Sequence, residues 1–240
     1  MKLAQVLFTQ GFGTRRECAD LIDADLVTMA GAICGDPDRE LMPEGLQFAV
    51  RGEPWAYHER ALLVMNKPAG YECSQKPKHH PSVYALLPAP LRSRGVQAIG
   101  RLDEDTTGVL LFTDDGTLIH RLTSPRHHVP KVYEVTCKHP IDADQIDKLT
   151  RGVLLHDENE TVRAAACEAT GPSSLRLTLM EGKYHQVKRM IAAAGNRVEA
   201  LHRSEFGPVG AEGISPGGWR WLSEAESSSV SRKRPPAVAP

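Results

Sequence analysis

The spacing of apolar and polar residues divides the chain into a short, partly helical segment at the amino end and a longer segment rich in strands. A helical first segment ends at residues 11–13, where two glycines stand. Thr14 is placed to cap a second helix over residues 15–24, and residues 27–31 are typical of a strand that enters a turn. Residues 1–50 are therefore predicted to form a small α/β module.

After residue 60 the pattern changes to short apolar or alternating runs, which are typical of strands. One helix is predicted over residues 183–194, where apolar residues repeat with helical spacing and Gly195 can terminate the helix. Few helices among several strands predict an α+β domain with a mixed, mainly antiparallel sheet over residues 61–226. The strands are predicted at residues 61–65, 109–113, 133–137 and 174–180.

Two segments lack the apolar residues that a packed element needs. Residues 51–60 are charged and polar and include glycine and proline, so they are predicted to be a linker. Residues 227–240 are rich in serine, proline and basic residues and are predicted to be a disordered tail. The sequence thus predicts two domains joined flexibly.

Composition narrows the class of protein. The chain has 240 residues, 41% of them hydrophobic, which is enough for a core without covalent staples. Its apolar runs fall far short of the roughly 20 residues that span a bilayer, and the amino end lacks the features of a secretory signal. The five cysteines lie far apart, without the spacing of a zinc site or a disulfide framework. We therefore expect a cytoplasmic protein with free thiols and no membrane partner.

Charge is nearly balanced overall but segregated locally. The chain carries 29 Lys and Arg against 30 Asp and Glu. Basic residues predominate in residues 62–102, 117–132 and 183–203, whereas acidic residues gather elsewhere. Such clusters are typical of nucleic-acid contacts, although taken alone they are equally compatible with ordinary solvated faces.

The densest group of polar residues stands directly before a predicted buried strand, in the loop of residues 100–108. Asp103 lies in this loop, two residues after Arg101. A carboxylate on a loop that leads into a rigid strand is well placed for catalysis. The alternative is that Asp103 only accepts hydrogen bonds from N–H groups of its own loop, and the short motif by itself favours that alternative.

Longer motifs resemble those of a known family. The string from Gly100 to Gly116, GRLDEDTTGVLLFTDDG, closely resembles the signature of pseudouridine synthases, in the branch that modifies ribosomal RNA and carries an amino-terminal S4-like RNA-binding domain. The segments KVYEV from Lys131 and EGKYHQVKRM from Glu181 resemble the second and third active-site motifs of the family, in the same order. The resemblance covers residues 1–225. It implies an S4-like module over residues 1–50 and a catalytic domain over residues 61–226.

The resemblance also implies roles for single residues. Asp103 matches the catalytic aspartate, as nucleophile or base, Tyr133 the ring that stacks on the target uracil, and Lys188 the basic partner of the aspartate, where many relatives have arginine. The reaction needs no metal and no cofactor. The S4-like module departs from the usual pattern at residues 14–16 and 27–31. The residues expected to contact RNA are Arg15, Arg16, Lys67, Arg101, Arg126, Lys131, His185, Gln186 and Arg189.

Three short segments further favour the bacterial small-subunit branch of the family: residues 124–128, 155–156 and 201–203. Members of that branch modify one uridine, at position 516, in 16S ribosomal RNA. The resemblance therefore implies 16S ribosomal RNA, or a small-subunit assembly intermediate, as the partner of a monomeric enzyme. A synthase acting on the large-subunit 23S ribosomal RNA is the alternative within the family.

Alternatives from other classes are weaker. A non-catalytic RNA-binding or ribosome-assembly factor could use the basic clusters alone, but it would not need Asp103, Tyr133 and Lys188 together. A glycoside hydrolase could use Asp103 and Asp105 as its carboxylates, but two residues so close in one loop do not reliably flank a sugar. A metal site at His127 and His128 is disfavoured because adjacent side chains diverge and no carboxylate or thiol accompanies them.

Overall fold

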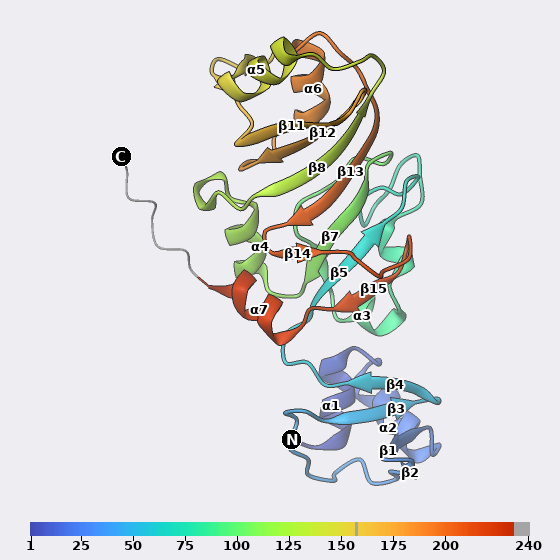
Figure 1. The fold of residues 1–240 in the computed structure, drawn as a ribbon. Coiled ribbons are helices and arrows are strands. Elements are labelled where there is room, and N and C mark those ends of the chain that lie inside the picture. Colours follow the sequence, from blue (N-terminus) through green and yellow to red (C-terminus); the bar gives the residue numbers. More distant parts are fainter. Residues whose placement is uncertain (157, 233–240) are drawn as a thin grey trace. The chain divides into compact units, whose positions relative to one another are not determined.

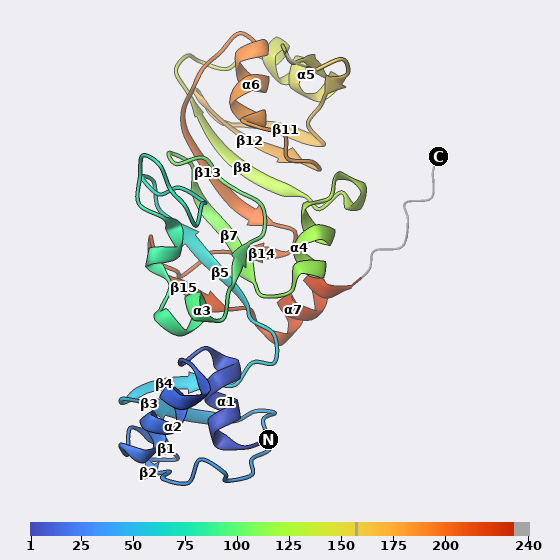
Figure 2. The same cartoon turned by 180° about the vertical axis from the view of Figure 1, so that it is seen from behind.

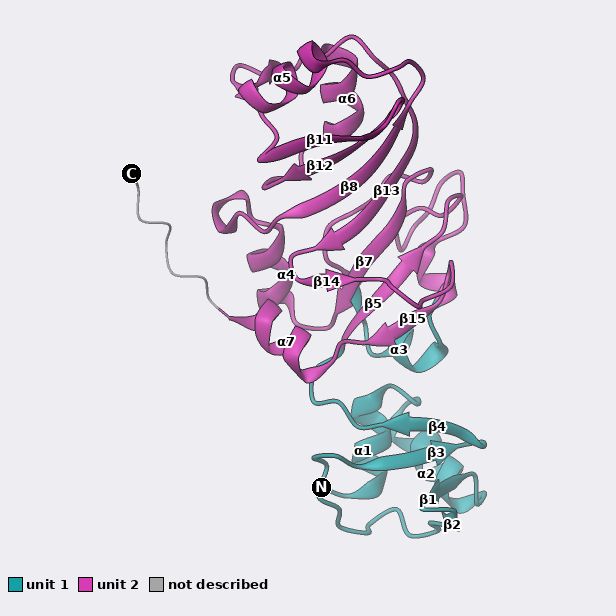
Figure 3. Ribbon diagram, in the orientation of Figure 1, with its two compact units in different colours: residues 1–61, 87–97 teal, residues 62–86, 98–240 magenta. Residues whose placement is uncertain are grey.

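The structure is a computed structural model that describes residues 1–156 and 158–232. Figures 1 and 2 show its helices and strands from two sides. The chain divides into two compact units, coloured separately in Figure 3. Unit 1 comprises residues 1–61 and 87–97, and unit 2 comprises residues 62–86 and the chain from residue 98 onward. Both units combine helices with strands, so the α+β prediction is confirmed.

Unit 1 packs two helices against a four-stranded sheet. The helices are α1 (Leu3–Gln10) and α2 (Arg15–Asp23). The predicted cap at Thr14 is present: its hydroxyl accepts the Glu17 N–H, and its own N–H donates to the Glu17 carboxylate. The strands, in the sheet order β2-β1-β3-β4, are β1 (Val27–Met29), β2 (Ala32–Ile33), β3 (Gln47–Val50) and β4 (Glu53–Ala56). The buried core is formed by Leu3, Val6, Leu7, Cys18, Ile22, Val27, Cys34, Phe48 and Val50.

The prediction that residues 51–60 form a linker is wrong for residues 53–56. Residues Glu53–Ala56 form β4, which pairs antiparallel with β3 and places Trp55 opposite Phe48. The Trp55 ring packs edge-on against Phe12, with 5.3 Å between the ring centroids. This segment has the composition of a linker, but it forms a strand because the Trp55 side chain packs into the core.

Unit 1 also takes a segment from inside the predicted second domain. Residues 87–97, which include α3 (Ala89–Ser93), belong to it. The Arg94 guanidinium donates to the side-chain oxygen of Gln10 at 3.0 Å, and Gln10 is fully buried. Gly11 has a φ of 87°, and a side chain there would collide with the Pro90 carbonyl. These contacts tie α3 to the end of α1, so the predicted boundary at residue 50 was too simple.

Unit 2 is built on a nine-stranded sheet with the main order β11-β12-β8-β13-β7-β5-β15. Neighbouring strands on this path are antiparallel, except that β13 runs parallel to β7. The predicted mixed, mainly antiparallel sheet is thus confirmed. The strands of the main path are β5 (Leu62–Lys67), β7 (Thr107–Thr113), β8 (Lys131–Cys137), β11 (Ala166–Gly171), β12 (Ser174–Leu179), β13 (Val198–Phe206) and β15 (Trp219–Trp221). The nine strands are completed by β6 (Gln97–Ala98), which pairs with β7, and β14 (Val209–Gly210), which pairs with β13. A separate two-stranded sheet is formed by β9 (Val153–Leu154) and β10 (Thr161–Val162).

The parallel contact between β7 and β13 depends on a glycine of the first motif. Gly108 has a φ of 103° and pairs with Arg203 of β13. A Cβ at Gly108 would collide with the backbone of Arg203. Only glycine permits this approach, which brings β13 beside the strand that follows the Asp103 loop.

Helices border this sheet. α5 (Ala143–Arg151) contacts β11, α6 (Gln186–Ala193) contacts β13, and α4 (Gly116–Thr123) packs on β7. Figures 1 and 2 show α5 and α6 together at the β11 end of the sheet, away from α4. Short 3-10 turns lie at Val83–Leu86 and Pro125–His127. A core cluster joins the sheet to α4: Val64, Ile99, Val109, Leu111, Leu118, Leu122, Phe206, Val209, Leu222 and Val230.

The predicted disordered tail begins too early. Residues Glu224–Ser231 form α7, capped by Ser223, and Val230 is buried in the core cluster. Arg220 holds the Glu226 carboxylate through two hydrogen bonds of 2.7 and 2.8 Å. The prediction is therefore wrong for residues 227–231, and its part over residues 233–240 lies outside the described residues. No helix within the described part of the chain is long and apolar enough to cross a membrane.

Candidate active site

Asp103 lies in the loop before β7, at the edge of a cavity in unit 2. Lys188, on α6, places its ammonium 3.1 Å from one Asp103 oxygen, and His185 Nε2 lies 3.3 Å from the other. The Asp103 side chain keeps 27% of its surface exposed. The carboxylate is thus held by two basic side chains from the third motif and still reaches solvent. These two contacts fix the orientation of the carboxylate at the cavity.

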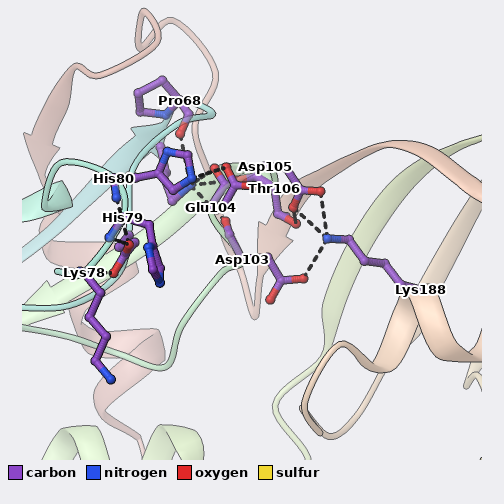
Figure 4. Close-up of polar contacts among 11 residues, drawn as sticks. Pro68, Lys78, His79, His80, Asp103, Glu104, Asp105, Thr106 and Lys188 are labelled. Carbon is purple, nitrogen blue, oxygen red and sulfur yellow. Dashed lines mark hydrogen bonds and ion pairs between the residues drawn. The ribbon is translucent and has the colours of Figure 1, made fainter.

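Lys188 has a second carboxylate partner that sequence reasoning missed. Its ammonium donates to both oxygens of Asp105, at 2.6 and 2.8 Å, so that it lies between Asp103 and Asp105 (Figure 4). Burial opposes the charge on Lys188, but the two carboxylates outweigh it and raise the lysine pKa. Burial likewise acts against ionised Asp105, but the hydrogen bond from Lys188 lowers its pKa below the ordinary value. One ammonium therefore supports two negative charges.

Lys67 was predicted to contact RNA, and the structure contradicts this. The residue is fully buried at the end of β5. Its ammonium lies 2.9 to 3.0 Å from the backbone oxygens of Pro68, Asp103, Glu104 and Thr106, which share its three N–H donors. Burial lowers its pKa, partly offset by the nearby acidic groups. A buried ammonium occupied by carbonyls cannot reach a phosphate. Lys67 instead fastens the Asp103 loop to the sheet, as a positioning residue.

The cavity beside Asp103 has a volume of about 130 Å³. Tyr133 lines it from β8, where it lies in register between Leu177 of β12 and Arg203 of β13. Lys131 of the same strand also lines it, almost completely buried. The cavity combines a carboxylate, an aromatic ring and basic groups, and it suits a small planar molecule.

The third motif adopts a turn before its helix. The helix predicted over residues 183–194 begins only at Gln186, because His185 has a left-handed backbone with a φ of 47°. Gln186 is buried; its side chain accepts the Lys183 N–H and donates to Glu181. These bonds stabilise the turn that aims His185 at Asp103. Gln186 also lines the cavity, so the prediction that it contacts RNA stays a prediction, restricted to a nucleotide inside the cavity.

The remaining predicted RNA contacts differ in position. Arg101 is exposed at the cavity, and Arg126 is exposed in the turn Pro125–His127. Arg189 donates to the Tyr184 backbone oxygen at 3.2 Å. Arg15 and Arg16 are exposed on α2 of unit 1, with Arg15 above the Phe8 ring. The positions of Arg101, Arg126, Arg15 and Arg16 leave their charges accessible to a large partner.

Two further features lie near the site: an exposed aromatic ring and an ordered loop that carries basic residues. Tyr184 is 72% exposed, and its ring stacks on His185 with 3.8 Å between centroids. Glu72 accepts the backbone N–H groups of Lys78, His79 and His80, at 2.8 to 3.1 Å, which lowers its pKa to about 2. This bonding, drawn in Figure 4, orders a loop that carries lysines and histidines.

Arg203 was not among the predicted site residues, yet it lines the cavity and is 2% exposed. It follows Leu201 by two positions, so both side chains point to the same face of β13. The alternation of side chains along residues 201–203 was the feature of the sequence from which a place for Arg203 beside Leu201 could have been predicted.

The comparison with known proteins agrees with this geometry. Residues 61–193 match the RNA pseudouridylate synthase family. The chain is 44% identical to ribosomal small subunit pseudouridine synthase A of Salmonella typhimurium and 43% identical to that of Escherichia coli, in each case over 87% of this chain and 90% of the relative. It is 39% identical to an uncharacterised RNA pseudouridine synthase of Bacillus subtilis, over 94% of this chain and 96% of the relative.

A solved structure extends the similarity to the fold. The crystal structure of a pseudouridylate synthase superimposes with a TM-score of 0.68 at 34% identity, over 96% of this chain and 99% of that one. The relatives and the solved structure cover most of the chain, and the family match covers residues 61–193. The chain therefore belongs to the RNA pseudouridine synthase family of isomerases.

Proposed function

We propose that the chain converts one uridine to pseudouridine in 16S ribosomal RNA, at position 516, with Asp103 as the catalytic carboxylate. The substrate class is supported by the names of the relatives at 43 and 44% identity, which act on the small ribosomal subunit. The chemistry is supported above all by the Asp103 carboxylate held between Lys188 and His185 at the cavity that Tyr133 lines. The enzyme acts in the cytoplasm as a monomer.

The reaction matches the small set of groups at the site. The bond between C1′ and N1 breaks, the uracil turns, and a bond forms between C5 and C1′, without net oxidation or reduction. An ionised carboxylate can serve as nucleophile or as base at the ribose. Lys188 and His185 orient Asp103, and Lys67 holds its loop. A uridine within folded RNA must first be flipped into the cavity, where Tyr133 replaces its lost stacking.

Unit 1 is proposed as the S4-like RNA-binding domain, which brings Arg15 and Arg16 to ribosomal RNA. Arg101, Arg126 and Arg189 supply further contacts around the cavity. These cations neutralise phosphates, so that binding depends on the release of counterions. Lys131 contacts the flipped nucleotide rather than a surface phosphate, since it is buried in the cavity wall.

The target is tested by mapping the modified nucleotide. Purified enzyme is incubated with unmodified 16S and 23S ribosomal RNA, both free and within assembly intermediates, and pseudouridine is located by mass spectrometry of nuclease fragments. The proposal requires one new pseudouridine, at position 516 of 16S ribosomal RNA. Modification of 23S ribosomal RNA alone would assign the chain to the large-subunit branch. Binding without modification of any ribosomal RNA would favour an assembly factor.

The salt dependence of RNA binding should reveal the phosphate contacts. If about five of the exposed Lys and Arg side chains meet phosphates, log K falls with log salt at a slope of about −3.5 to −4.5. Replacing Arg15 and Arg16 together with glutamine should make this slope less steep by about 1.4 to 1.8. Arg151→Gln, on α5, is the control and should leave it unchanged. Filter binding across a salt series measures the slopes, and equal slopes for all proteins would contradict an RNA-binding role of α2.

Substitutions of Tyr133 should separate its ring from its hydroxyl. Tyr133→Phe keeps the stacking surface and should bind substrate RNA nearly as tightly as the wild type. Tyr133→Ala removes the ring and should weaken binding by about 1–3 kcal/mol. Affinity is measured below the unfolding temperature of each variant, because Tyr133 is 8% exposed and its truncation leaves a void. Equal affinities of the two variants would argue against stacking.

A further inference from the structure

Two buried cations lie in the cavity wall, and neither has a carboxylate partner among the residues that the structure describes. Lys131 is 8% exposed and Arg203 is 2% exposed, and both line the same cavity as Asp103. They come from neighbouring strands, β8 and β13, in a register that sets Arg203 opposite Tyr133 and Phe206 opposite Lys131. The Lys131 ammonium and the Arg203 guanidinium lie 5.4 and 5.3 Å from the centre of the Phe206 ring. The pair is therefore held against one aromatic side chain beneath the cavity.

The hydrogen bonds of these cations are incomplete. Arg203 Nε donates to the Val109 backbone oxygen at 2.8 Å, but its buried Nη2 has no partner among the described residues. Lys131 Nζ donates to the Val129 backbone oxygen at 2.9 Å, which occupies one of its three protons. Within the described residues neither side chain forms an ion pair. The cavity wall therefore carries buried N–H donors that lack an acceptor, although buried donors in proteins are normally hydrogen-bonded.

Their electrostatic cost is considerable. Burial and the neighbouring charge of Arg203 lower the Lys131 pKa to about 8, and the charge of Glu181 opposes this only in part. Two desolvated like charges destabilise the fold unless a further group compensates them. Such an arrangement is typical of a site prepared for a negative charge that appears only when the ligand is bound or reacting.

The reaction proposed above generates such a charge. When the C1′–N1 bond breaks, its electron pair stays on N1, and uracil becomes a planar anion whose charge spreads to O2 and O4. This holds whether Asp103 acts as nucleophile or as base. In the second half of the reaction the electron pair from the uracil ring forms the C5–C1′ bond. If Asp103 is the nucleophile, its bond to C1′ breaks in this step and the carboxylate is released; if Asp103 is the base, the proton that it removed from the ribose returns there. A proton then leaves C5 and a proton is taken up at N1, which restores neutrality.

We propose that Lys131 and Arg203 are catalytic residues that stabilise the detached uracil anion by donating to its carbonyl oxygens, an inference that rests on the proposed function. Asp103 lies at the same cavity and faces the ribose side of the reaction, so the site separates its charges: a carboxylate toward C1′ and two cations toward the leaving base. The neutral uracil of the bound substrate gains less from these cations than the anion does. They therefore act on the chemical step more than on RNA binding.

The test compares the variants Lys131→Met and Arg203→Met with the wild type in single-turnover reactions at saturating RNA. Loss of one such donor is expected to slow the chemical step by about 10²- to 10³-fold, with RNA affinity nearly unchanged. Arg203→Lys retains a charge and should recover part of the rate. Lys148→Met, which removes an exposed lysine from α5, is the matched control. Circular dichroism and RNA binding identify any variant that fails to fold, and Arg203→Lys then replaces Arg203→Met in the comparison.

A second substrate distinguishes charge stabilisation from simple positioning. RNA with 5-fluorouridine at the target has a better leaving group, because fluorine stabilises the uracil anion, and cleavage of its C1′–N1 bond is followed as loss of 5-fluorouridine after nuclease digestion. The ratio of the wild-type rate to the variant rate should be at least about tenfold smaller on this RNA than on the uridine RNA. Equal losses on both substrates, or losses in affinity alone, would overturn the inference while leaving the proposed function intact. An inactive wild type on every ribosomal RNA would instead remove the proposed function itself.

Discussion

Replacing Asp103 with asparagine should abolish pseudouridine formation while leaving the fold and the RNA affinity nearly intact. The substitution keeps the volume of the side chain but removes the charge that Lys188 and His185 orient, at 3.1 and 3.3 Å. An amide can act neither as the nucleophile nor as the base. We expect a loss on the order of 10⁴-fold, at the upper end of what one acid–base group contributes. Release of tritium from C5-labelled uridine in 16S ribosomal RNA measures turnover.

The matched control for this variant is Asp105→Asn, in the same loop. Asp105 shares the Lys188 ammonium with Asp103 but does not line the cavity. When the charge of Asp105 is removed, Lys188 still pairs with Asp103, so this variant should retain substantial turnover. Substantial tritium release by Asp103→Asn would refute the assignment of Asp103 as the catalytic carboxylate. Loss confined to Asp105→Asn would transfer the role to that residue.

Replacing Lys67 with methionine should unfold the Asp103 loop and destabilise unit 2. Methionine fills much of the same space but leaves four backbone oxygens without their donor. A buried unsatisfied group costs about 1–3 kcal/mol. Burial of the lysine itself opposes its charge and lowers its pKa, so the net loss is smaller than the sum. We expect a decrease in the free energy of unfolding of about 3 kcal/mol and a fall in turnover of about 10²-fold through the displaced carboxylate.

This prediction can be followed by local fluorescence. Trp219 and Trp221 lie in β15, which pairs with β5, the strand of Lys67. Trp55→Phe removes the tryptophan of unit 1 from the background. Urea unfolding of Lys67→Met should then show a lower midpoint, whereas Lys138→Met, at an exposed position after β8, should not change it. An unchanged midpoint would mean that the four hydrogen bonds do not hold the loop.

Local patterns in the sequence were sufficient for much of the fold. Apolar runs and alternation placed the strands that became β5, β7, β8 and β12, because a strand buried on one or both faces must show them. Thr14 with Glu17 marked the start of α2 through a contact three residues apart. The mixed, mainly antiparallel class followed from these elements. The net charge of the whole chain hides the local clusters of basic residues, which only the distribution of charge along the sequence reveals.

Residues 53–56 of the predicted linker and residues 227–231 of the predicted tail form a strand and a helix for the same reason. Composition averages over a segment, whereas burial of a single side chain decides whether it joins the core. Trp55 converts the polar segment after β3 into β4, and Val230 anchors α7. The core residues that Trp55 and Val230 contact cannot be identified from the sequence next to either residue.

By itself the sequence determined which groups are available for chemistry, namely the carboxylate of Asp103, the ring of Tyr133 and the ammonium of Lys188, in motifs whose order marks the family. Only the tertiary structure decided what each basic residue does. Lys67 is turned inward because β5 pairs with β7 and meets the carbonyls of the Asp103 loop. Arg203 enters the cavity because Gly108 admits β13 beside β7. Lysine and arginine look alike in a sequence whether they meet phosphate, carbonyl or carboxylate, since those partners are selected by strand register and chain crossings between residues far apart in the chain.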